Sequence, residues 1–225
     1  MAIIAAAGSG VRMKTDTVKQ FLELNGKPLL CVTLMGFQAS PSIDGIIIVA
    51  PERDVSYCRK NVVEKFNFNK VRKVIAGGKR RQDSVRLGIE ASAGDYEFVL
   101  IHDGVRPLIQ ERLIDRVVVE GKRNRAVITG LQAKETIKEI DRHGSVIKTH
   151  NRRKMWLIQT PQIFRYNDIM TAHKRAVDEG WENVTDDALL MEKMGIPVKV
   201  IEGSEENIKV TTLYDLGLVR SLLKN

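Results

Sequence analysis

Apolar and polar positions follow two different rhythms along the chain. Short runs rich in Ile, Val and Ala are separated by stretches in which apolar residues recur every three or four positions, as on one face of a helix. The helical spacing predicts helices at 27–40, 51–66, 165–180, 185–195 and 213–223. The short apolar runs predict β-strands at 2–6, 43–50, 70–77, 96–103, 125–131 and 197–203.

The order of these elements indicates an α/β fold. Strands that alternate with helices form a mostly parallel, Rossmann-like sheet whose two faces are both covered by helices. Ligands of such sheets bind at the carboxyl ends of the strands. The glycine-rich turn that follows strand 2–6 must therefore lie at the ligand-binding edge.

The pattern changes after Gly130. A turn signal at 141–144 stands between two segments of roughly alternating polarity within 131–164. We therefore expect a β-hairpin arm that leaves the main sheet, at about 132–151. No break in composition marks a linker, so 1–225 is expected to form one domain that carries this arm.

Composition narrows the setting of the protein. No apolar stretch approaches the roughly 20 residues that span a bilayer, and the first ten residues lack the features of a secretory signal. We expect a cytoplasmic protein without a membrane partner. Cys31 and Cys58 stand alone, with no histidine cluster nearby, so both are expected to be reduced and at least partly buried.

The net charge of +8 favours an anionic partner. Lysine and arginine are spread along the chain and are dense only in 77–84 and 150–156, with few aromatic residues nearby on which bases could stack. This distribution favours local sites for small anions and no nucleic-acid partner. The alternative from another class is a basic nucleic-acid-binding protein, which would lose binding steeply as salt rises.

The turn after the first strand has the composition of an anion-binding loop. Gly8 and Gly10 allow successive backbone amides to point at phosphate oxygens, although an ordinary strand-to-helix turn also uses glycine. The loop lacks the third glycine of the dinucleotide fingerprint and the Gly-Lys-Ser/Thr of the nucleoside-triphosphatase loop. Arg12 and Lys19 add two cations that can neutralise a triphosphate during phosphoryl or nucleotidyl transfer.

Eight blocks, in order along the chain, resemble those of the 2-C-methyl-D-erythritol 4-phosphate cytidylyltransferase family, a branch of the sugar-phosphate nucleotidyltransferases. Together the blocks cover nearly the whole chain. Val18, Glu135 and Asn151 stand where the family more often has proline, aspartate and aspartate. The blocks lie at 5–13, 19–30, 77–89, 99–109, 135–138, 156–164, 184–195 and 206–216.

This resemblance implies a binding site for CTP. Arg12 and Lys19 would be the catalytic cations on its phosphates, because attack of one phosphate on another needs positioning and charge neutralisation but no protein nucleophile. The implied CTP-binding residues are Ala6, Ala7, Gly8, Gly10, Gly77, Gly78, Ser84, Asp103 and Gly104.

The resemblance also implies a second site, for methylerythritol phosphate. Asp103 would in addition lie near a Mg²⁺ ion that the CTP phosphates mainly hold. From its position alone, Asp103 could instead be a helix cap or the partner of Arg106 in a structural salt bridge, and Lys209 could be an exposed strand lysine. The implied residues of this second site are Asp103, Arg106, Thr136, Arg152, Thr160 and Lys209.

Several neighbouring residues are interpreted as structural. Arg80 and Arg81 are expected to be surface charges at the start of a helix. His102 is expected to be structural rather than catalytic, and Trp156 to pack at the base of the arm. The Thr-Asp-Asp sequence at 185–187 is expected to be a helix N-cap with acidic residues in the first turn.

The implied reaction joins CTP and 2-C-methyl-D-erythritol 4-phosphate into 4-diphosphocytidyl-2-C-methyl-D-erythritol and pyrophosphate, in non-mevalonate isoprenoid biosynthesis. A ribitol- or ribulose-phosphate cytidylyltransferase is the nearest alternative, although the Thr-Ile-Lys segment at 136–138 and Lys209 favour methylerythritol phosphate. The family further implies a homodimer. Each polar arm, too long to be buried in its own domain, would cross to the partner and carry Thr136 and Arg152 into the partner's site.

Overall fold

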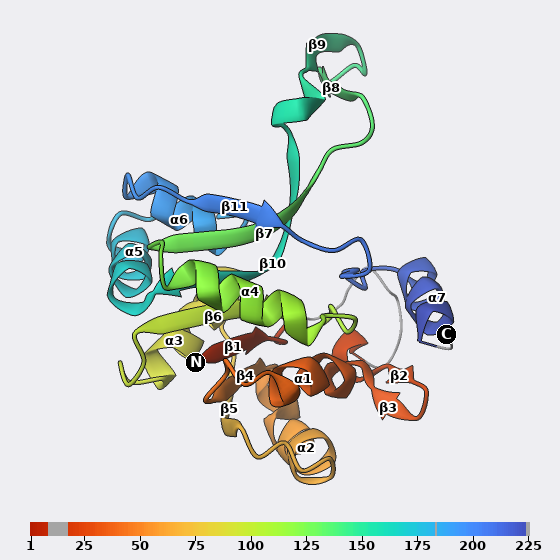
Figure 1. The fold of residues 1–225 in the computed structure, drawn as a ribbon, viewed down its shortest axis with the longest axis vertical. Helices are drawn as coiled ribbons and strands as arrows, with labels where there is room; N and C mark the ends of the chain where they lie inside the picture. The colour runs from red at the N-terminus through yellow and green to blue at the C-terminus, as the bar shows by residue number, and fades with distance from the viewer. Residues whose placement is uncertain (9–17, 183, 224–225) are drawn as a thin grey trace.

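A seven-stranded sheet forms the centre of the protein, in a computed structural model that describes residues 1–8, 18–182 and 184–223. Its strand order is β11-β7-β10-β6-β1-β4-β5 (Figure 1). Neighbouring strands are parallel except beside β10, which runs antiparallel to both β6 and β7. The mostly parallel sheet expected from the sequence is therefore confirmed. The strands are β1 Ala2–Ala5, β4 Ile46–Ala50, β5 Val71–Ala76, β6 Phe98–Asp103, β7 Ala126–Gln132, β10 Trp156–Arg165 and β11 Lys199–Glu202.

Helices cover both faces of this sheet (Figure 1). Residues of α1 and α4 pack against one face, and residues of α3, α5 and α6 pack against the other. Successive strand side chains point to opposite faces, so Ile4 packs with the first set and its neighbour Ile3 with the second. The helices are α1 Leu29–Ala39, α2 Val55–Cys58, α3 Arg81–Ala91, α4 Glu111–Gly121, α5 Tyr166–Asp178, α6 Asp187–Lys193 and α7 Leu213–Leu222.

The helix expected at 51–66 has a more broken form. A 3₁₀ turn at Glu52–Asp54 leads into α2, which continues as a π-helical turn at Arg59–Glu64. Cys58 of this segment and Cys31 of α1 are both free and fully buried, as expected. Burial raises the pKa of each thiol to about 12, so both are protonated at neutral pH.

The segment before α7 returns to the carboxyl edge of the sheet. Helix α7 lies beside a small hairpin formed by β2 (Glu23–Leu24) and β3 (Lys27–Pro28), and an apolar cluster that includes Val105 and Val210 holds it there. Val210 donates its N–H to the carbonyl oxygen of Val105 at 2.8 Å. This contact places Lys209 beside the loop that follows β6.

Strand β10 belongs to the main sheet, although its alternating pattern predicted a part of the arm. The structure confirms a hairpin in the expected place, formed by β8 (Ile137–Ile140) and β9 (Val146–His150), but 156–165 returns to the middle of the main sheet between β7 and β6. Its pairing with β7 shifts register between Gln159 and Gln162. Pro161 lies at this irregularity, where a missing N–H interrupts no ladder bond.

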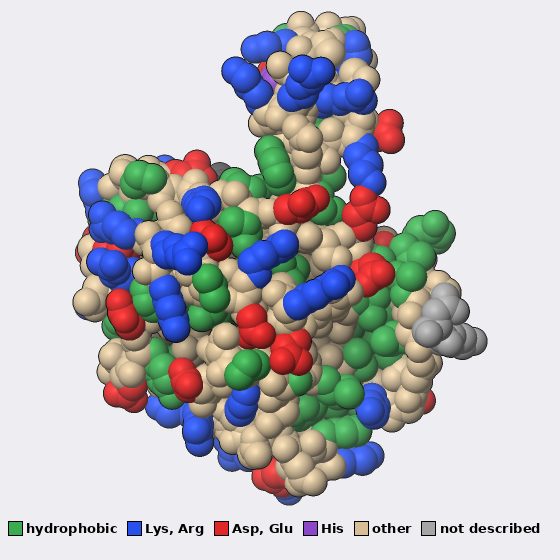
Figure 2. All heavy atoms as spheres, viewed as in Figure 1, with side chains coloured by type: hydrophobic (Ala, Val, Ile, Leu, Met, Phe, Trp, Pro, Cys, Tyr) green, Lys and Arg blue, Asp and Glu red, His purple; other side chains and the backbone are tan. Residues whose placement is uncertain are grey.

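The arm projects away from the body of the protein (Figure 1). Its two strands pair with each other, and most of their side chains are exposed, including Ile140, Val146 and Ile147. Lysine and arginine side chains gather toward its tip (Figure 2). At its base, Trp156 is 38% exposed, so the expected packing there leaves part of the ring open to solvent.

The helices are short compared with the thickness of a bilayer. Within the described ranges, none is both long and apolar enough to cross one. The expected cytoplasmic location stays a prediction.

The two faces of α4 provide a test of the packing. Val117 is fully buried against the sheet, whereas Val119, two positions later, is 48% exposed. We expect Val117→Ala to lower the free energy of unfolding by about 2 kcal/mol, through lost burial and a cavity. The matched change Val119→Ala should alter it by less than about 0.5 kcal/mol. Urea denaturation measures both, and equal effects would contradict the packing of α4.

Candidate active site

Two cavities meet at the carboxyl edge of the sheet. The first, of about 290 Å³, lies between the turn after β1 and the start of α3; we call it the loop cavity. The second, of about 820 Å³, lies between α6 and strands β7, β10 and β11; we call it the α6 cavity. Arg81, Asp103 and Lys209 line both cavities and form the boundary between them.

The turn after β1 is fixed at both of its ends. Ala6 donates its N–H to the carbonyl oxygen of Val49 at 2.8 Å, which continues the pairing of β1 with β4. The buried side chain of Gln20 donates to the carbonyl oxygen of Ala6, also at 2.8 Å. This bond brings 18–21 back to the turn and places Lys19 in the wall of the loop cavity. Gly10 and Arg12 lie outside the described residues.

The second glycine block packs closely against the first loop. A Cβ atom on Gly77 would lie 2.3 Å from the Cβ of Ala7, and one on Gly78 would lie 2.5 Å from the Cβ of Asp83. Only glycine permits these approaches. Gly78 also donates its N–H to the hydroxyl of Ser84 at 3.1 Å, which ties this turn to α3. The backbone of the block is therefore held against one wall of the loop cavity.

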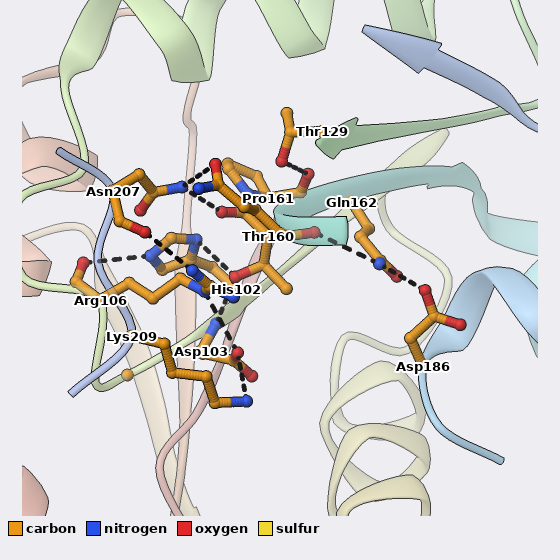
Figure 3. A network of polar contacts seen from close by, with 12 residues as sticks. His102, Asp103, Arg106, Thr129, Thr160, Pro161, Gln162, Asp186, Asn207 and Lys209 are labelled. Atoms are coloured by element: carbon orange, nitrogen blue, oxygen red, sulfur yellow. Dashed lines mark hydrogen bonds and ion pairs between the residues drawn. The ribbon is translucent and has the colours of Figure 1, made fainter. Parts of the chain in front are cut away.

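Asp103, the last residue of β6, lies among three cations, of which Figure 3 shows Arg106 and Lys209. Its Oδ2 atom is 2.8 Å from Nζ of Lys209 and 3.4 Å from Nε of Arg106, and its Oδ1 atom is 3.5 Å from Nε of Arg81. The residue is 5% exposed. Burial by itself would raise the pKa of Asp103, but the three nearby cations together hold it below its ordinary value. The carboxylate is therefore ionised at neutral pH.

A buried network holds the backbone of this carboxylate (Figure 3). Asp103 donates its N–H to the hydroxyl of Thr160 at 3.0 Å, and that oxygen is 3.1 Å from Nδ1 of His102. Burial lowers the pKa of His102 to about 3, so the ring is neutral. The hydroxyl of Thr160 can then donate to Nδ1 while Nε2 donates to the carbonyl oxygen of Arg106, 3.4 Å away. This arrangement supports the structural interpretation of His102.

Arg106 is fixed from a second direction. Its Nη1 atom donates to the carbonyl oxygen of Asn207 at 2.8 Å, and Nδ2 of Asn207 donates to the carbonyl oxygen of Thr160 at 2.7 Å. Arg106 is 8% exposed and has a pKa that burial lowers, although Asp103 opposes the shift. Asp103 and Arg106 therefore form the salt bridge that their positions suggested, and both also line a cavity.

The structure brings most of the expected site residues together. Gly77 and Gly104 adjoin the loop cavity, where Gly104 donates its N–H to the carbonyl oxygen of Ala5 at 2.9 Å. Thr136 and Arg152 lie on the exposed arm, and Arg152 donates to the carbonyl oxygen of Lys134 there. The α6 cavity is lined by Asp103, Arg106, Thr160 and Lys209. The loop cavity is lined by Ala6, Ala7, Gly8, Lys19, Gly78, Ser84 and Asp103.

Two residues have surroundings that the sequence analysis did not predict. Arg80 is exposed, as expected, and pairs with Asp83. Arg81 was also expected to be a surface charge, but it lines both cavities and donates from Nη1 to Oδ2 of Asp187 at 2.8 Å. The N-cap expected within 185–187 is Asp186, which accepts the N–H of Leu189, and the acidic residue of the first turn, Asp187, is 1% exposed. Arg81 stands three positions before Ser84, on the same face of α3, and that spacing was the available signal.

The chain is similar to known proteins over its full length. The family model described as IspD, 2-C-methyl-D-erythritol 4-phosphate cytidylyltransferase, matches residues 1–225. A cytidylyltransferase of this name from Geotalea uraniireducens is 45% identical over 226 residues, covering 100% of this chain and 96% of the relative. One from Syntrophus aciditrophicus is 42% identical over 224 residues, covering 100% and 95%.

Solved structures agree with these relatives. The 4-diphosphocytidyl-2C-methyl-D-erythritol synthase from Anaerococcus prevotii is 34% identical, with a TM-score of 0.87 and coverage of 100% of this chain and 97% of that one. The 2-C-methyl-D-erythritol 4-phosphate cytidylyltransferase from Thermus thermophilus is 28% identical, with a TM-score of 0.82 and coverage of 100% and 98%.

The mostly parallel sheet, with a glycine-built, cation-lined cavity at its carboxyl edge, is that of a nucleotidyltransferase. Within this class of enzymes, the match over the full length decides the family. The chain belongs to the 2-C-methyl-D-erythritol 4-phosphate cytidylyltransferase family.

The neutral His102 predicts a pH dependence of stability. In the unfolded chain its pKa returns to about 6.5, whereas in the folded chain it is about 3. Between these values the unfolded state binds the extra proton, so stability must fall as the pH falls. Between pH 7 and pH 4, the unfolding free energy should drop by about 3 kcal/mol more for the parent than for His102→Gln. Urea denaturation at several pH values measures this, and parallel profiles would contradict it.

Proposed function

We propose that this protein transfers the cytidylyl group of CTP to 2-C-methyl-D-erythritol 4-phosphate, releasing pyrophosphate and 4-diphosphocytidyl-2-C-methyl-D-erythritol. The observation that carries the proposal is the pair of cavities that share Arg81, Asp103 and Lys209. A reaction between two phosphates needs two adjoining anion sites, and this boundary has that form. The names of the relatives supply the two substrates.

The chemistry requires positioning and charge neutralisation. A phosphate oxygen of the alcohol phosphate attacks the α-phosphorus of CTP, a new P–O bond forms, and the bond from the α-phosphorus to the oxygen that bridges to the β-phosphorus breaks. The electron pair of that bond leaves with pyrophosphate. Negative charge accumulates on the oxygens of the phosphates, so cations aimed at them lower the barrier. We assign this role to Lys19 in the wall of the loop cavity and to Arg12.

The base and ribose of CTP are assigned to the glycine-rich side of the loop cavity. Backbone groups at Gly77 and Gly78 are held against Ala7 and α3, so the space between them has a fixed width. Main-chain donors and acceptors beside Ser84 can read the edge of cytosine, while the close walls exclude a larger purine. Ala6, Gly8 and Gly104 complete the backbone around the nucleotide in this proposal.

The phosphate of the second substrate is assigned to the cations of the α6 cavity. Three cations surround the carboxylate of Asp103, and one of them, Arg81, also pairs with the carboxylate of Asp187, which leaves an excess of one positive charge at the boundary. A phosphate can therefore be attracted without removing the partner that keeps Arg106 charged and oriented. Thr160 lines the same cavity, and its hydroxyl already accepts the N–H of Asp103, so we assign it to shaping this site.

The protein side chains of this site could supply only some of the ligands that a divalent cation needs. Within the described ranges, no three His, Cys, Asp or Glu side chains come together to hold a metal ion. Asp103 is a carboxylate that lines both cavities, and Mg²⁺ is often bound by one carboxylate together with substrate phosphates. We propose that Asp103 and the phosphate oxygens of CTP hold Mg²⁺, which would neutralise charge on the triphosphate when bound.

We also propose a homodimer formed through the arm. An isolated two-stranded hairpin is barely stable in water, and this one exposes Ile140, Val146 and Ile147 to 58–60%. A partner surface would cover these apolar side chains. It would also bring the arm residues Thr136 and Arg152, which line neither cavity of their own chain, to the α6 cavity of the partner.

Substrate turnover tests the proposed reaction. With CTP and Mg²⁺, pyrophosphate release should be fast with 2-C-methyl-D-erythritol 4-phosphate and at least about tenfold slower with ribitol or ribulose 5-phosphate. Lys19→Ala should reduce turnover 10²-fold or more, with an unchanged melting temperature. Lys27→Ala, a matched change outside both cavities, should leave turnover intact. Turnover of ribitol phosphate alone, or salt-sensitive nucleic-acid binding without any turnover, would overturn the assignment.

Subunit exchange tests the crossed arm. Lys19→Ala and Arg152→Ala should each be nearly inactive alone, but an exchanged equimolar mixture should recover about a quarter of the parental activity. Half of the dimers are then mixed, and one of the two sites in each mixed dimer carries both defects while the other carries neither. Replacing the Arg152→Ala partner by the double variant Lys19→Ala/Arg152→Ala should abolish the recovery. A mixture that exchanges subunits but stays inactive would contradict the crossed arrangement.

A further inference from the structure

A line of polar contacts runs from α5 through the interior to Asp103. Nε2 of His173 is 3.6 Å from Oδ1 of Asp187, whose Oδ2 accepts the bond from Nη1 of Arg81 at 2.8 Å. Nε of Arg81 is in turn 3.5 Å from Oδ1 of Asp103. His173 is fully buried and Asp187 is 1% exposed, so the line begins in the core and ends at the boundary between the two cavities.

The position of Asp187 in the first turn of α6 does not explain why its side chain is buried. Its neighbour Asp186 already caps the helix, and an acidic residue in the first turn would interact with the helix dipole equally well from the surface. Burying a carboxylate is costly unless it is paired. Burial opposes ionisation of Asp187, but the charge of Arg81 with help from His173 lowers its pKa below the ordinary value. The pairing with Arg81 is thus what keeps the buried charge.

The surroundings of His173 and Asp187 are otherwise short of polar partners. Within the described part of the chain, neither ring nitrogen of His173 has a hydrogen bond, and neither does Oδ1 of Asp187. Each of these atoms is buried. An apolar pair of similar volume would pack here without this cost. We therefore relate the costly burial of His173 and Asp187 to the contact that Asp187 makes with Arg81.

The geometry of Arg81 shows what the line achieves. Its side chain is 30% exposed and lines both cavities, so its planar head stands where the substrates meet. Two atoms of that head, Nη1 and Nε, are engaged by carboxylates on opposite sides. Two anchors fix both the position and the plane of a guanidinium, whereas one anchor would leave it free to rotate.

We propose that Asp187, steadied by His173, is a positioning residue that aims the guanidinium of Arg81 at the phosphates of both substrates. The inference rests on the proposed function, because that reaction places the two phosphates at this boundary. Without the charge of Asp187, Arg81 would keep only its longer contact with Asp103 and would turn toward it. The reaction would lose an aligned cation while the glycine walls that hold the nucleotide stay in place.

Steady-state kinetics test this role. Asp187→Asn should lower kcat 10- to 100-fold and change the KM for CTP less than threefold. In an Arg81→Met background the same substitution should change kcat less than twofold, because the residue acts through Arg81. Asp168→Asn is the matched control, since it removes a carboxylate that pairs with Arg125 outside both cavities, and it should leave kcat unchanged. Equal losses from Asp187→Asn in both backgrounds would overturn the proposal.

A second variant and a spectroscopic readout keep the test independent of folding and of turnover. If Asp187→Asn does not fold, His173→Gln should still lower kcat about threefold, and this loss too should vanish in the Arg81→Met background. The ¹⁵N–¹Hε signal of Arg81, assigned by its absence in Arg81→Met, should be sharp in the parent and broadened in either variant. A sharp, unshifted signal in the folded variants would overturn the positioning role. Absent turnover of the parent with a broadened variant signal would instead reject the proposed function alone.

Discussion

The rest of the site depends on the attraction between the ionised carboxylate of Asp103 and three cations. Asp103 ends β6, and its three cationic neighbours come from the start of α3, the loop after β6 and the segment before α7. These parts of the chain would repel one another if the carboxylate were missing, since Arg81, Arg106 and Lys209 converge on a space of a few ångströms. The negative charge of Asp103 thus holds together an edge of the fold that keeps an excess of positive charge even with Asp187 counted. An enzyme that binds phosphates requires such an excess.

The backbone of Asp103 is held by β10, the strand that runs antiparallel to its neighbours β6 and β7. Thr160 and Gln159 lie where β10 changes register with β7, and their side chains contact Asp103 and the 204–207 segment. Regular pairing would point successive side chains alternately to the two faces of the sheet. The irregularity instead presents a hydroxyl and amides along the edge. A break in the ladder is therefore what brings polar groups to the edge of the sheet where the two cavities meet.

Features that depend on local sequence patterns could be predicted from the sequence. Periodicity located the strands on which Ile3, Ile47 and Leu100 are buried, and a glycine-rich turn after the first strand located the loop cavity. The family resemblance added Lys209, which lies about 190 positions beyond Lys19 and has no local signal of its own.

What escaped prediction depends on pairings between distant segments. Strand β10 resembles the arm in its alternation, and only its two partners in the sheet show that it belongs to the centre. Arg81 and Asp187 are 106 positions apart, and each alone has the sequence surroundings of an ordinary exposed charge. Patterns among residues adjacent in sequence do not predict that Arg81 and Asp187 meet, because their burial depends on how α3, α5 and α6 pack together.

The contact of Val210 with Val105 also affects the order in which the site can form during folding. A ribosome delivers the chain from its amino end, and domains fold as their segments emerge. The glycine turn, α3 and Asp103 are all available before the segment that carries Lys209 has been made. Until that segment docks, the boundary between the cavities lacks one of its cations. A nascent chain can therefore build most of its sheet while the proposed phosphate site still lacks Lys209, so the proposed site is completed among the last events of folding.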